Sequence, residues 1–490
     1  MSMIQISNLT FSYEGSYDTI FDQVSFQIDT DWKLGFTGRN GRGKTTFLSL
    51  LMGCYEYSGT ISSSVSFDYF PYEITGKDRN TLEIAETVRP GFELWKLCRE
   101  LNLLEVDAEV LYRPFSSLSN GEQTKVLLAL LFSEENHFLL IDEPTNHLDM
   151  EGRKLVSRYL NSKKGFILVS HDQWFLDSCI DHILSINRTT IEIQQGNFSS
   201  WQQNKAYQDH FEQMENERLK KDIRRLQVSA GRTKNWSDKI ESGKIGSHSA
   251  DRGYIGHKAA KMMKRSKAAE NRMEQAAEEK SALLKNIETA DQLKLFPLNH
   301  HCDDLVTMRD LSLYYGERKV LGPVSFTLRQ GQRLSIQGKN GSGKSSILKL
   351  MLGKSIKTTG EYSLASGLIL SYVPQDTSFL RGTLKDYISS QQLDETLFKA
   401  LLRKLDFSRV QFEKNMEEFS GGQKKKVLIA RSLCERAHIY IWDEPLNYID
   451  IFSRRQIEDL LLTYQPTMIF VEHDQSFVNR VATDVLYLTS

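Results

Sequence analysis

The feature that most constrains the fold of this chain is a glycine-rich motif that occurs twice. The sequence GRNGRGKTT runs from Gly38 to Thr46, and GKNGSGKSS runs from Gly338 to Ser346, so that Lys44 and Lys344 lie 300 positions apart. Each motif follows a short apolar, strand-like segment and precedes a pattern typical of a helix. A repeat of this length indicates two copies of one domain within the 490 residues.

Further landmarks follow the motif at matched distances in both copies. A serine comes 75 or 76 residues after the lysine, a glutamate comes 99 or 100 residues after it, and a histidine comes 28 or 29 residues after the glutamate. They are Ser119, Glu143 and His171 in the first copy, and Ser420, Glu444 and His473 in the second. Because HFLLIDEP and HIYIWDEP are apolar enough for the centre of a parallel sheet covered by helices, we predict an α/β fold for both copies. We place them at residues 1–199 and 301–490.

The repeated motif has the spacing G-x-x-x-x-G-K-[ST] of a phosphate-binding loop. Its glycines allow backbone N–H groups to approach phosphate oxygens, its lysine reaches the β and γ phosphates, and the helix that follows favours an anion at its N-terminus. The hydroxyls of Thr45 and Ser345 suit magnesium. The predicted phosphate-binding residues are Gly38, Asn40, Gly41, Gly43, Lys44, Thr45 and Thr46, and Gly338, Asn340, Gly341, Gly343, Lys344, Ser345 and Ser346.

An acidic pair ends an apolar strand in each copy. Asp142 precedes Glu143, and Asp443 precedes Glu444. The aspartate can hold magnesium, directly or through water, and the glutamate can orient the water that attacks a phosphate. We therefore predict that Glu143 and Glu444 are catalytic and that Asp142 and Asp443 are metal ligands.

Composition excludes several other classes of protein. With 40% hydrophobic and 26% charged residues and only 9 prolines, the chain is typical of compact globular proteins. Its 5 cysteines are scattered, which indicates neither a disulfide framework nor a zinc site and fits a reducing cytoplasm. The N-terminal sequence lacks the pattern of a signal peptide, and no apolar run is long enough to span a bilayer. We expect a cytoplasmic protein.

The segment between the copies, residues 200–300, differs in kind from both of them. Helical spacing of apolar residues and long polar stretches predict a helical hairpin, with one helix over most of 201–240 and a tip loop near 241–256. Although the whole chain has a net charge of -1, residues 221–267 contain 13 Lys or Arg and 4 acidic residues. Such a density of positive charge favours phosphate backbones, and the tip is compatible with RNA. The tip-facing candidates are Lys239, Lys244, Ile245 and Tyr254.

Two further motifs carry a resemblance to a known family. With LSNGEQ at 118–123 and FSGGQ at 419–423, lying between the glycine-rich loop and the acidic strand of each copy, the chain resembles an ATP-binding cassette protein. The resemblance implies that ATP and Mg²⁺ bind at two composite sites, where the signature serine and glycine of one cassette close over the phosphate-binding loop of the other. The implied signature residues are Ser119, Gly121, Ser420 and Gly422.

The same resemblance assigns roles to residues outside these motifs. It implies D-loop roles for Asp149 and Asp450, γ-phosphate contacts for His171 and His473, and adenine stacking for Tyr13 and Tyr315. Gln375 in SYVPQD matches the glutamine loop of the family, near the metal and the attacking water, whereas the first copy has Tyr72 in YFPYE. We therefore expect two active sites that hydrolyse ATP at different rates.

Two cassettes in one chain, with a long basic linker and no membrane domain, resemble the ABC-F family, whose members act on ribosomes. The sequence GNFSSWQQNK at 196–205 resembles the start of that family's linker. The short spacing from Tyr72 to Leu118 leaves no room for the arm of housekeeping members, so the chain is most similar to the Lsa/Vga-type antibiotic-resistance branch.

That branch implies a specific mechanism. The partner is the bacterial 70S ribosome, including 23S rRNA around the tRNA exit site and the P-site tRNA, with neither DNA nor a membrane subunit, and the chain acts as a monomer. ATP-bound cassettes would sit at the exit site while the linker protects the peptidyl-transferase centre from lincosamides, pleuromutilins and streptogramin A.

Three alternatives remain open. A general ABC-F translation factor would use the same sites without conferring resistance. A transport ATPase subunit would lack a use for the basic linker, and coiled insertions of DNA-repair or chromosome ATPases usually interrupt a cassette rather than separate two.

Overall fold

The computed structural model describes residues 2–13, 19–39, 42–134, 137–146, 148–187, 190–242, 264, 267, 268, 272, 275 and 293–488. The chain forms two compact units, of which one contains residues 1–201 and 290–490 and the other contains residues 202–289. Both copies of the repeat belong to the first unit. Within the described residues, no helix is both long and apolar enough to cross a membrane.

Each copy of the repeat contains two sheets. In the first copy, the antiparallel sheet has the order β2-β1-β4, and the larger sheet has the order β5-β6-β7-β3-β8-β9, in which only β8 and β9 pair antiparallel. The strands are β1 (Met3–Ser12), β2 (Thr19–Asp29), β3 (Lys33–Thr37), β4 (Ser58–Ser62), β5 (Ser66–Phe70), β6 (His137–Asp142), β7 (Phe166–Val169), β8 (His182–Asn187) and β9 (Thr190–Gln195). The predicted α/β fold with a central parallel sheet is confirmed.

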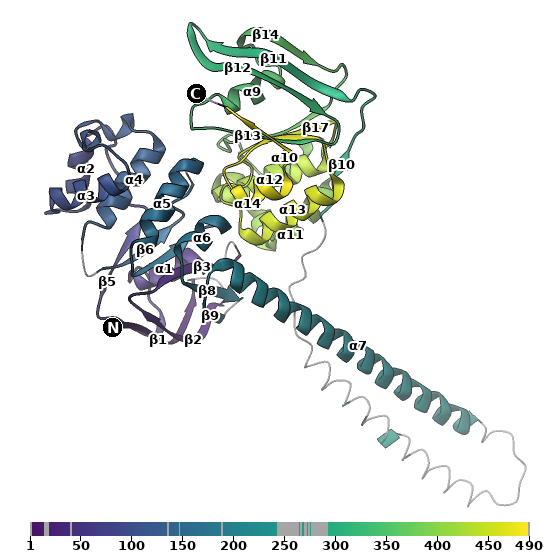
Figure 1. Ribbon diagram of the computed structural model, residues 1–490. Coiled ribbons are helices and arrows are strands. Elements are labelled where there is room, and N and C mark those ends of the chain that lie inside the picture. Colours follow the sequence, from purple (N-terminus) through teal and green to yellow (C-terminus); the bar gives the residue numbers. More distant parts are fainter. Residues whose placement is uncertain are drawn as a thin grey trace, which may run out of the picture. The chain divides into compact units, whose positions relative to one another are not determined.

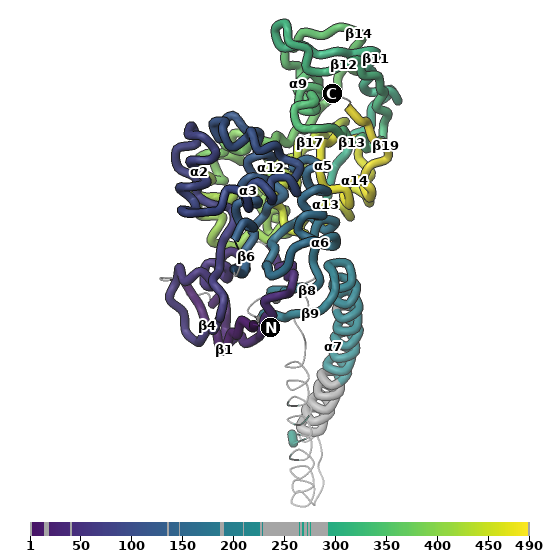
Figure 2. Tube along the Cα trace, turned by 60° about the vertical axis from the view of Figure 1, so that its left-hand side comes forward, coloured from purple at the N-terminus to yellow at the C-terminus, as the bar shows by residue number. Residues whose placement is uncertain are grey.

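The second copy repeats this plan. Its antiparallel sheet has the order β12-β11-β14, and its parallel sheet has the order β15-β17-β18-β13-β19. These strands are β11 (Asp304–Tyr315), β12 (Arg318–Arg329), β13 (Arg333–Gln337), β14 (Lys357–Leu364), β15 (Leu370–Val373), β17 (Ile439–Asp443), β18 (Met468–Val471) and β19 (Asp484–Tyr487), and a small parallel pair joins β10 (Phe296–Pro297) to β16 (Arg436–Ala437). Figure 2 shows β11, β12 and β14 side by side.

Helices complete the layers of each copy. The first copy has α1 (Lys44–Leu51), α2 (Thr81–Val88), α3 (Leu94–Leu103), α4 (Asn120–Leu131), α5 (Met150–Asn161) and α6 (Gln173–Cys179). The second has α9 (Lys344–Met351), α10 (Leu384–Ser390), α11 (Glu395–Lys404), α12 (Gly421–Cys434), α13 (Ile451–Tyr464) and α14 (Gln475–Val481). Helices α1 and α9 each pack between the two sheets of their copy, and the other helices build a separate core on the opposite face of the parallel sheet (Figure 1).

The helix predicted after the first copy is confirmed as α7 (Phe198–Ser242), which has 45 residues. At 1.5 Å per residue it is roughly 68 Å long. Phe198 and Trp201 in its first turn are buried in the core of the first copy. The return arm and tip of the predicted hairpin lie outside the described residues, apart from isolated positions, and the predicted domain limits at 199 and 300 stay predictions.

Candidate active sites

The glycine-rich loops take the same conformation in both copies. Gly43 and Gly343 immediately precede α1 and α9 with φ angles of 90° and 92°, a region that side chains disfavour. A Cβ atom on Gly43 would lie 2.5 Å from Ile20 Cγ2, so this position requires glycine. Lys44 and Lys344 each direct Nζ back to the loop, donating to a carbonyl oxygen of Gly38 or Gly338 at 2.7 Å. The loop is thus arranged around the lysine amine.

The acidic strands end beside these loops because β6 and β17 lie close to β3 and β13 in the parallel sheets. Thr45 Oγ1 donates to Asp142 Oδ2 at 3.1 Å, and a side-chain hydrogen bond joins Ser345 to Asp443. Burial raises the pKa of both aspartates, and these hydroxyl groups oppose the shift. Asp443 Oδ1 is buried and has no hydrogen-bond partner among the described residues. Carboxylate and hydroxyl oxygens at the phosphate loop suit Mg²⁺ well.

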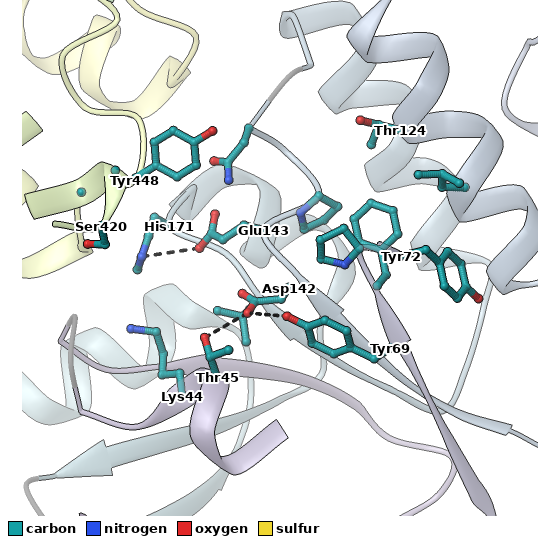
Figure 3. Close-up of a pocket in the computed structure, with 18 of the residues that line it drawn as sticks. Lys44, Thr45, Tyr69, Tyr72, Thr124, Asp142, Glu143, His171, Ser420 and Tyr448 are labelled. Carbon is teal, nitrogen blue, oxygen red and sulfur yellow. Dashed lines mark hydrogen bonds and ion pairs between the residues drawn. The ribbon is translucent and has the colours of Figure 1, made fainter. Parts of the chain in front are cut away.

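The glutamates follow with a turn of the backbone that directs them toward the histidines. Glu143 and Glu444 have φ angles of 50° and 48°, a left-handed conformation that costs a non-glycine residue on the order of 1–3 kcal/mol. His171 Nε2 lies 3.5 Å from Glu143 Oε1, and His473 Nε2 lies 3.4 Å from Glu444 Oε1 (Figure 3 for the first pair). The structure therefore brings together the glutamate and histidine predicted for each site.

Two cavities contain these residues, and each draws its lining from both copies of the repeat. The first site, a cavity of about 910 Å³, is lined by Lys44, Thr45, Asp142, Glu143 and His171 of the first copy and by Ser420, Gly421, Gly422 and Tyr448 of the second. The second site, a cavity of about 430 Å³, is lined by Lys344, Ser345, Gln375, Glu444 and His473 together with Ser119, Asn120 and Asn146 of the first copy. Both volumes lie within the range of sites for small ligands.

The signature serines have a structural role that is visible without ATP. Ser119 and Ser420 are the N-caps of α4 and α12, and each forms a capping box with the residue three positions later, Glu122 or Gln423. Such a cap satisfies N–H groups that the first helical turn leaves free. The helix starts that face the cavities are therefore well defined.

The two sites differ around their glutamates. In the second site, Gln375 Nε2 and Asn447 Nδ2 each donate to Glu444 Oε2 at 2.8 Å. In the first site, Tyr72 lines the cavity but donates its hydroxyl to Asp68, whereas Tyr69 donates to the metal-site carboxylate Asp142 at 3.2 Å. Sequence reasoning identified Tyr72 as the divergent position and missed Tyr69, which is three residues earlier on β5.

The electrostatics of the glutamates also differ. Burial, followed by the charge of Asp142, raises the pKa of Glu143 to about 8 against the attraction of Arg454 and Lys44. Burial acts in the same direction on Glu444, but the hydrogen bond and charge of His473 and the charges of Lys425 and Lys344 outweigh it and lower the pKa. The surroundings of the second glutamate thus favour its ionised form, whereas burial of the first opposes ionisation.

The remaining predicted residues differ in where the structure places them. Tyr13 lines the first site and its hydroxyl forms a hydrogen bond with Thr46 at 2.8 Å, whereas Tyr315 is 48% exposed and lines neither of the two sites. Gly121 lines a neighbouring groove with Asp149. Several predicted residues lie outside the described part of the chain: Asn40, Gly41, Lys244, Ile245 and Tyr254. Lys239 is within α7.

Among the described residues, one other group of side chains has the chemistry of a metal site. The donor atoms of His300, His301 and Cys302 lie within 4.8 Å of one another. However, His300 Nδ1 accepts from the backbone N–H of Cys302 at 3.1 Å, and His300 Nε2 lies 3.0 Å from the carbonyl oxygen of Ser366. Both ring nitrogens are thus already engaged, and we assign no metal to this group.

Together, the fold and the paired cavities define a P-loop nucleotidase with two composite sites. Residues 21–146 and 321–447 match the family model described as "ABC transporter", which covers just over half of the chain. The chain therefore belongs to the ABC transporter family and contains two tandem ATP-binding cassettes, which make it an ATPase.

Several relatives are similar along almost the whole chain. The chain is 28% identical to the ribosome protection protein VmlR of Bacillus subtilis, an alignment that covers 100% of this chain and 87% of VmlR. It is 25% identical to the energy-dependent translational throttle protein EttA of Haemophilus influenzae, covering 95% of this chain and 88% of EttA. Another relative, at 25% identity, 99% of this chain and 76% of the relative, is ABC transporter F family member 2 of Arabidopsis thaliana. The resemblance to ABC-F proteins is confirmed.

A solved structure shows the same fold. The RNase-L inhibitor superimposes with a TM-score of 0.62 at 20% sequence identity, covering 99% of this chain and 88% of that one. The two-cassette fold is therefore shared well beyond the range of clear sequence similarity.

Proposed function

We propose that Glu143 and Glu444 orient the water that attacks the γ-phosphate of ATP in the first and second site. The observation that supports this role is the matched contact of each glutamate with a histidine beside the phosphate loop, at 3.5 and 3.4 Å. Lys44 and Lys344 bind the phosphates, and His171 and His473 contact the γ-phosphate. Ser119 and Ser420, with the glycines that follow them, close each site from the opposite cassette.

Mg²⁺ fits the hydroxyl and carboxylate oxygens beside each loop. We assign it to Thr45 and Asp142 in the first site, and to Ser345, Asp443 and Gln375 in the second. When bound, this cation neutralises phosphate charge as the bond to the leaving group breaks. The buried, unpartnered Asp443 Oδ1 supports the assignment, because a buried carboxylate oxygen without a partner is costly.

We further propose that this ATPase acts on the bacterial 70S ribosome. The domain division is a first cassette at 1–199, a basic linker at 200–300 and a second cassette at 301–490. Support comes from the long helix α7, from the 13 Lys or Arg of residues 221–267, and from relatives whose names refer to ribosome protection and translation. Cation density of this kind favours nucleic-acid phosphates, and we propose rRNA as their source.

The finer proposal is protection from antibiotics of the peptidyl-transferase centre, namely lincosamides, pleuromutilins and streptogramin A. ATP-bound cassettes hold the protein at the exit site, next to 23S rRNA and the P-site tRNA, while the linker tip acts on the drug site. Hydrolysis then releases the protein. Similarity to VmlR favours this function, whereas similarity to EttA supports the second candidate, a translation factor without a role in resistance.

The double variant Glu143→Gln plus Glu444→Gln tests both parts of the proposal. Glutamine keeps the size of the side chain but cannot orient water as a carboxylate does, so turnover should fall by at least ~100-fold while ATP binding persists. Because hydrolysis is the release step, this variant should co-sediment with 70S ribosomes in the presence of ATP and remain bound.

A matched control replaces Glu83 and Glu395, one exposed glutamate in each cassette, with glutamine. This control should retain full turnover. Undiminished hydrolysis in the Glu143 and Glu444 double variant would remove these glutamates from the mechanism. Association with membranes but not with ribosomes would instead favour a transport ATPase.

A further inference from the structure

Two buried positions carry small hydroxyl side chains in the first cassette and charged side chains in the second. Thr124 on α4 corresponds to Lys425 on α12. Ser170, which precedes His171, corresponds to Glu472, which precedes His473. All four side chains are buried, and Lys425 and Glu472 are only 3% and 2% exposed. Burying charge is expensive unless the charge is compensated, so this difference needs an explanation.

Lys425 contacts the loop that supplies the glutamine of the second site. Its Nζ donates to the carbonyl oxygen of Pro374 at 2.9 Å, and the next residue, Gln375, donates to Glu444 Oε2. Burial lowers the pKa of Lys425 to about 8, and the charge of Glu472 is the largest opposing influence. The lysine thus fixes the backbone immediately before Gln375.

Glu472 contacts the two segments on the other side of Glu444. Its Oε1 accepts the backbone N–H of Leu446 at 2.7 Å, and its Oε2 accepts the backbone N–H of His473 at 3.2 Å. Asn447, which follows Leu446, donates to Glu444, and His473 is within ion-pair distance of it. One buried carboxylate therefore holds two of the segments that surround Glu444.

The first cassette has different contacts at these positions. Thr124 donates to Asn120 O within its own helix, and it lines the first site (Figure 3). The hydroxyl of Ser170 lies 3.3 Å from that of Thr145 and accepts the backbone N–H of Asp172. Glu143 Oε1 is buried and has no hydrogen-bond partner among the described residues. The first glutamate shares the histidine contact, since His171 Nε2 lies 3.5 Å from Glu143 Oε1. The described residues give it no counterpart of the amide hydrogen bonds that Gln375 and Asn447 donate to Glu444.

We propose that Lys425 and Glu472 are positioning residues that hold Gln375 and His473 against Glu444, and that they make the second site the faster of the two. The inference rests on the proposed catalytic role of Glu444. Neither residue lines the second site. Each acts through a backbone segment, and a small displacement of a reacting group lowers the rate of the chemical step more than it weakens binding.

The test replaces the pair with the residues of the first cassette. Lys425→Thr, Glu472→Ser and the double variant are made with Glu143→Gln, so that only the second site turns over. Each single change should lower kcat by about tenfold and alter the KM for ATP by less than about twofold. The double variant removes both buried charges and should not recover kcat, whether or not it recovers the melting temperature that each single variant loses.

Two controls separate positioning from stability. Lys424→Thr makes the same substitution one residue earlier on α12, at a half-buried lysine, and should leave kcat unchanged. Lys425→Arg keeps a cationic donor and should retain kcat within about threefold. If Glu143→Gln alone stops turnover, the series is measured with Glu143 intact, and the same fall is expected because the two sites then act together.

Unchanged kcat in both single variants, or a double variant that recovers kcat along with its melting temperature, would overturn the proposal. Failure of the catalytic assignment itself has a different signature. In that case the Glu143→Gln plus Glu444→Gln variant continues to hydrolyse ATP, whatever residues occupy positions 425 and 472.

Discussion

The ion pair between Lys426 and Asp450 is one of the most deeply buried in the described structure. Lys426 Nζ lies 2.8 Å from Asp450 Oδ2, and the two side chains are 4% and 1% exposed. Asp450 also caps α13, accepting from the backbone N–H and the hydroxyl of Ser453. Burial alone would raise the pKa of Asp450, but the charge and hydrogen bond of Lys426 outweigh it and hold the pKa well below the ordinary 3.8.

Lys426→Met should therefore destabilise the chain by about 3–5 kcal/mol, because a buried carboxylate loses its partner. The pKa of Asp450 is lower in the folded protein than in the unfolded chain. Its ion pair with Lys426 therefore stabilises the folded parent fully above pH 3.8, and this contribution is lost as the pH falls toward the folded-state pKa. Without Lys426, burial raises the pKa of Asp450 in the folded variant, so the variant takes up a proton that relieves its penalty as the pH falls. The difference between parent and variant in denaturant unfolding should hence be largest at high pH and shrink steadily as the pH falls toward about 4. The equivalent change Lys125→Met, at a half-exposed lysine, should cost less than about 1 kcal/mol. An equal cost at both positions would contradict this account.

Residue identities in the sites were predictable where a motif fixes them. The phosphate loops, the Asp-Glu pairs and the histidines follow from type and spacing, because phosphate binding demands particular groups at particular intervals. Tyr69, Lys425 and Glu472 were missed. Their roles depend on which face of a strand or helix points inward and on contacts between distant segments. A comparison of the two copies would have shown that Thr124 corresponds to Lys425, which marks position 425 as different in the second copy.

At the scale of elements, the basic face of α7 carries the proposed affinity for rRNA. Lys221, Arg224 and Arg225 are exposed on this helix. Replacing all three with glutamine should weaken ribosome binding and reduce the slope of log affinity against log salt by roughly 2 to 3, since each phosphate contact contributes about 0.7–0.9. Co-sedimentation of the Glu143→Gln plus Glu444→Gln protein over a series of salt concentrations measures this slope.

The same helix provides a control of opposite charge. Glu212, Glu215 and Glu217 lie on α7 as well, and their replacement with glutamine should not reduce the slope. Equal slopes for the basic triple variant and the parent would show that this part of the helix does not contact phosphate.

The elements themselves were largely predictable from periodicity. Apolar runs predicted the central strands. The spacing of apolar residues predicted α7 nearly to its ends, because this helix of 45 residues contains no proline and no strong stop signal. The order of strands in each sheet was not predictable from such patterns. It depends on the pairing of segments far apart in sequence, such as Leu334 with Ile469 and with Asp484.

At the scale of the whole molecule, the proposed protection from antibiotics requires nucleotide sites and linker in one chain. Expression of the protein in a susceptible bacterium should raise the inhibitory concentration of at least one of the lincosamides, pleuromutilins and streptogramin A. The Glu143→Gln plus Glu444→Gln variant should not protect, because a protein that cannot leave the ribosome blocks translation. An inhibitor of cell-wall synthesis serves as the control drug. No change for any of the three classes would favour the translation-factor function.

The buried charges at positions 425 and 472 also bear on how the two halves of this gene can change. After duplication, homologous halves can exchange sequence by gene conversion. A conversion tract that copies threonine to position 425, but stops before position 472, leaves the buried Glu472 without its nearby lysine. A tract that copies serine to position 472, but not threonine to position 425, leaves the buried Lys425 without its nearby glutamate. We expect either intermediate to be less stable than both starting points. Selection against such intermediates would keep the halves distinct at these two positions and would preserve the proposed inequality of the two sites.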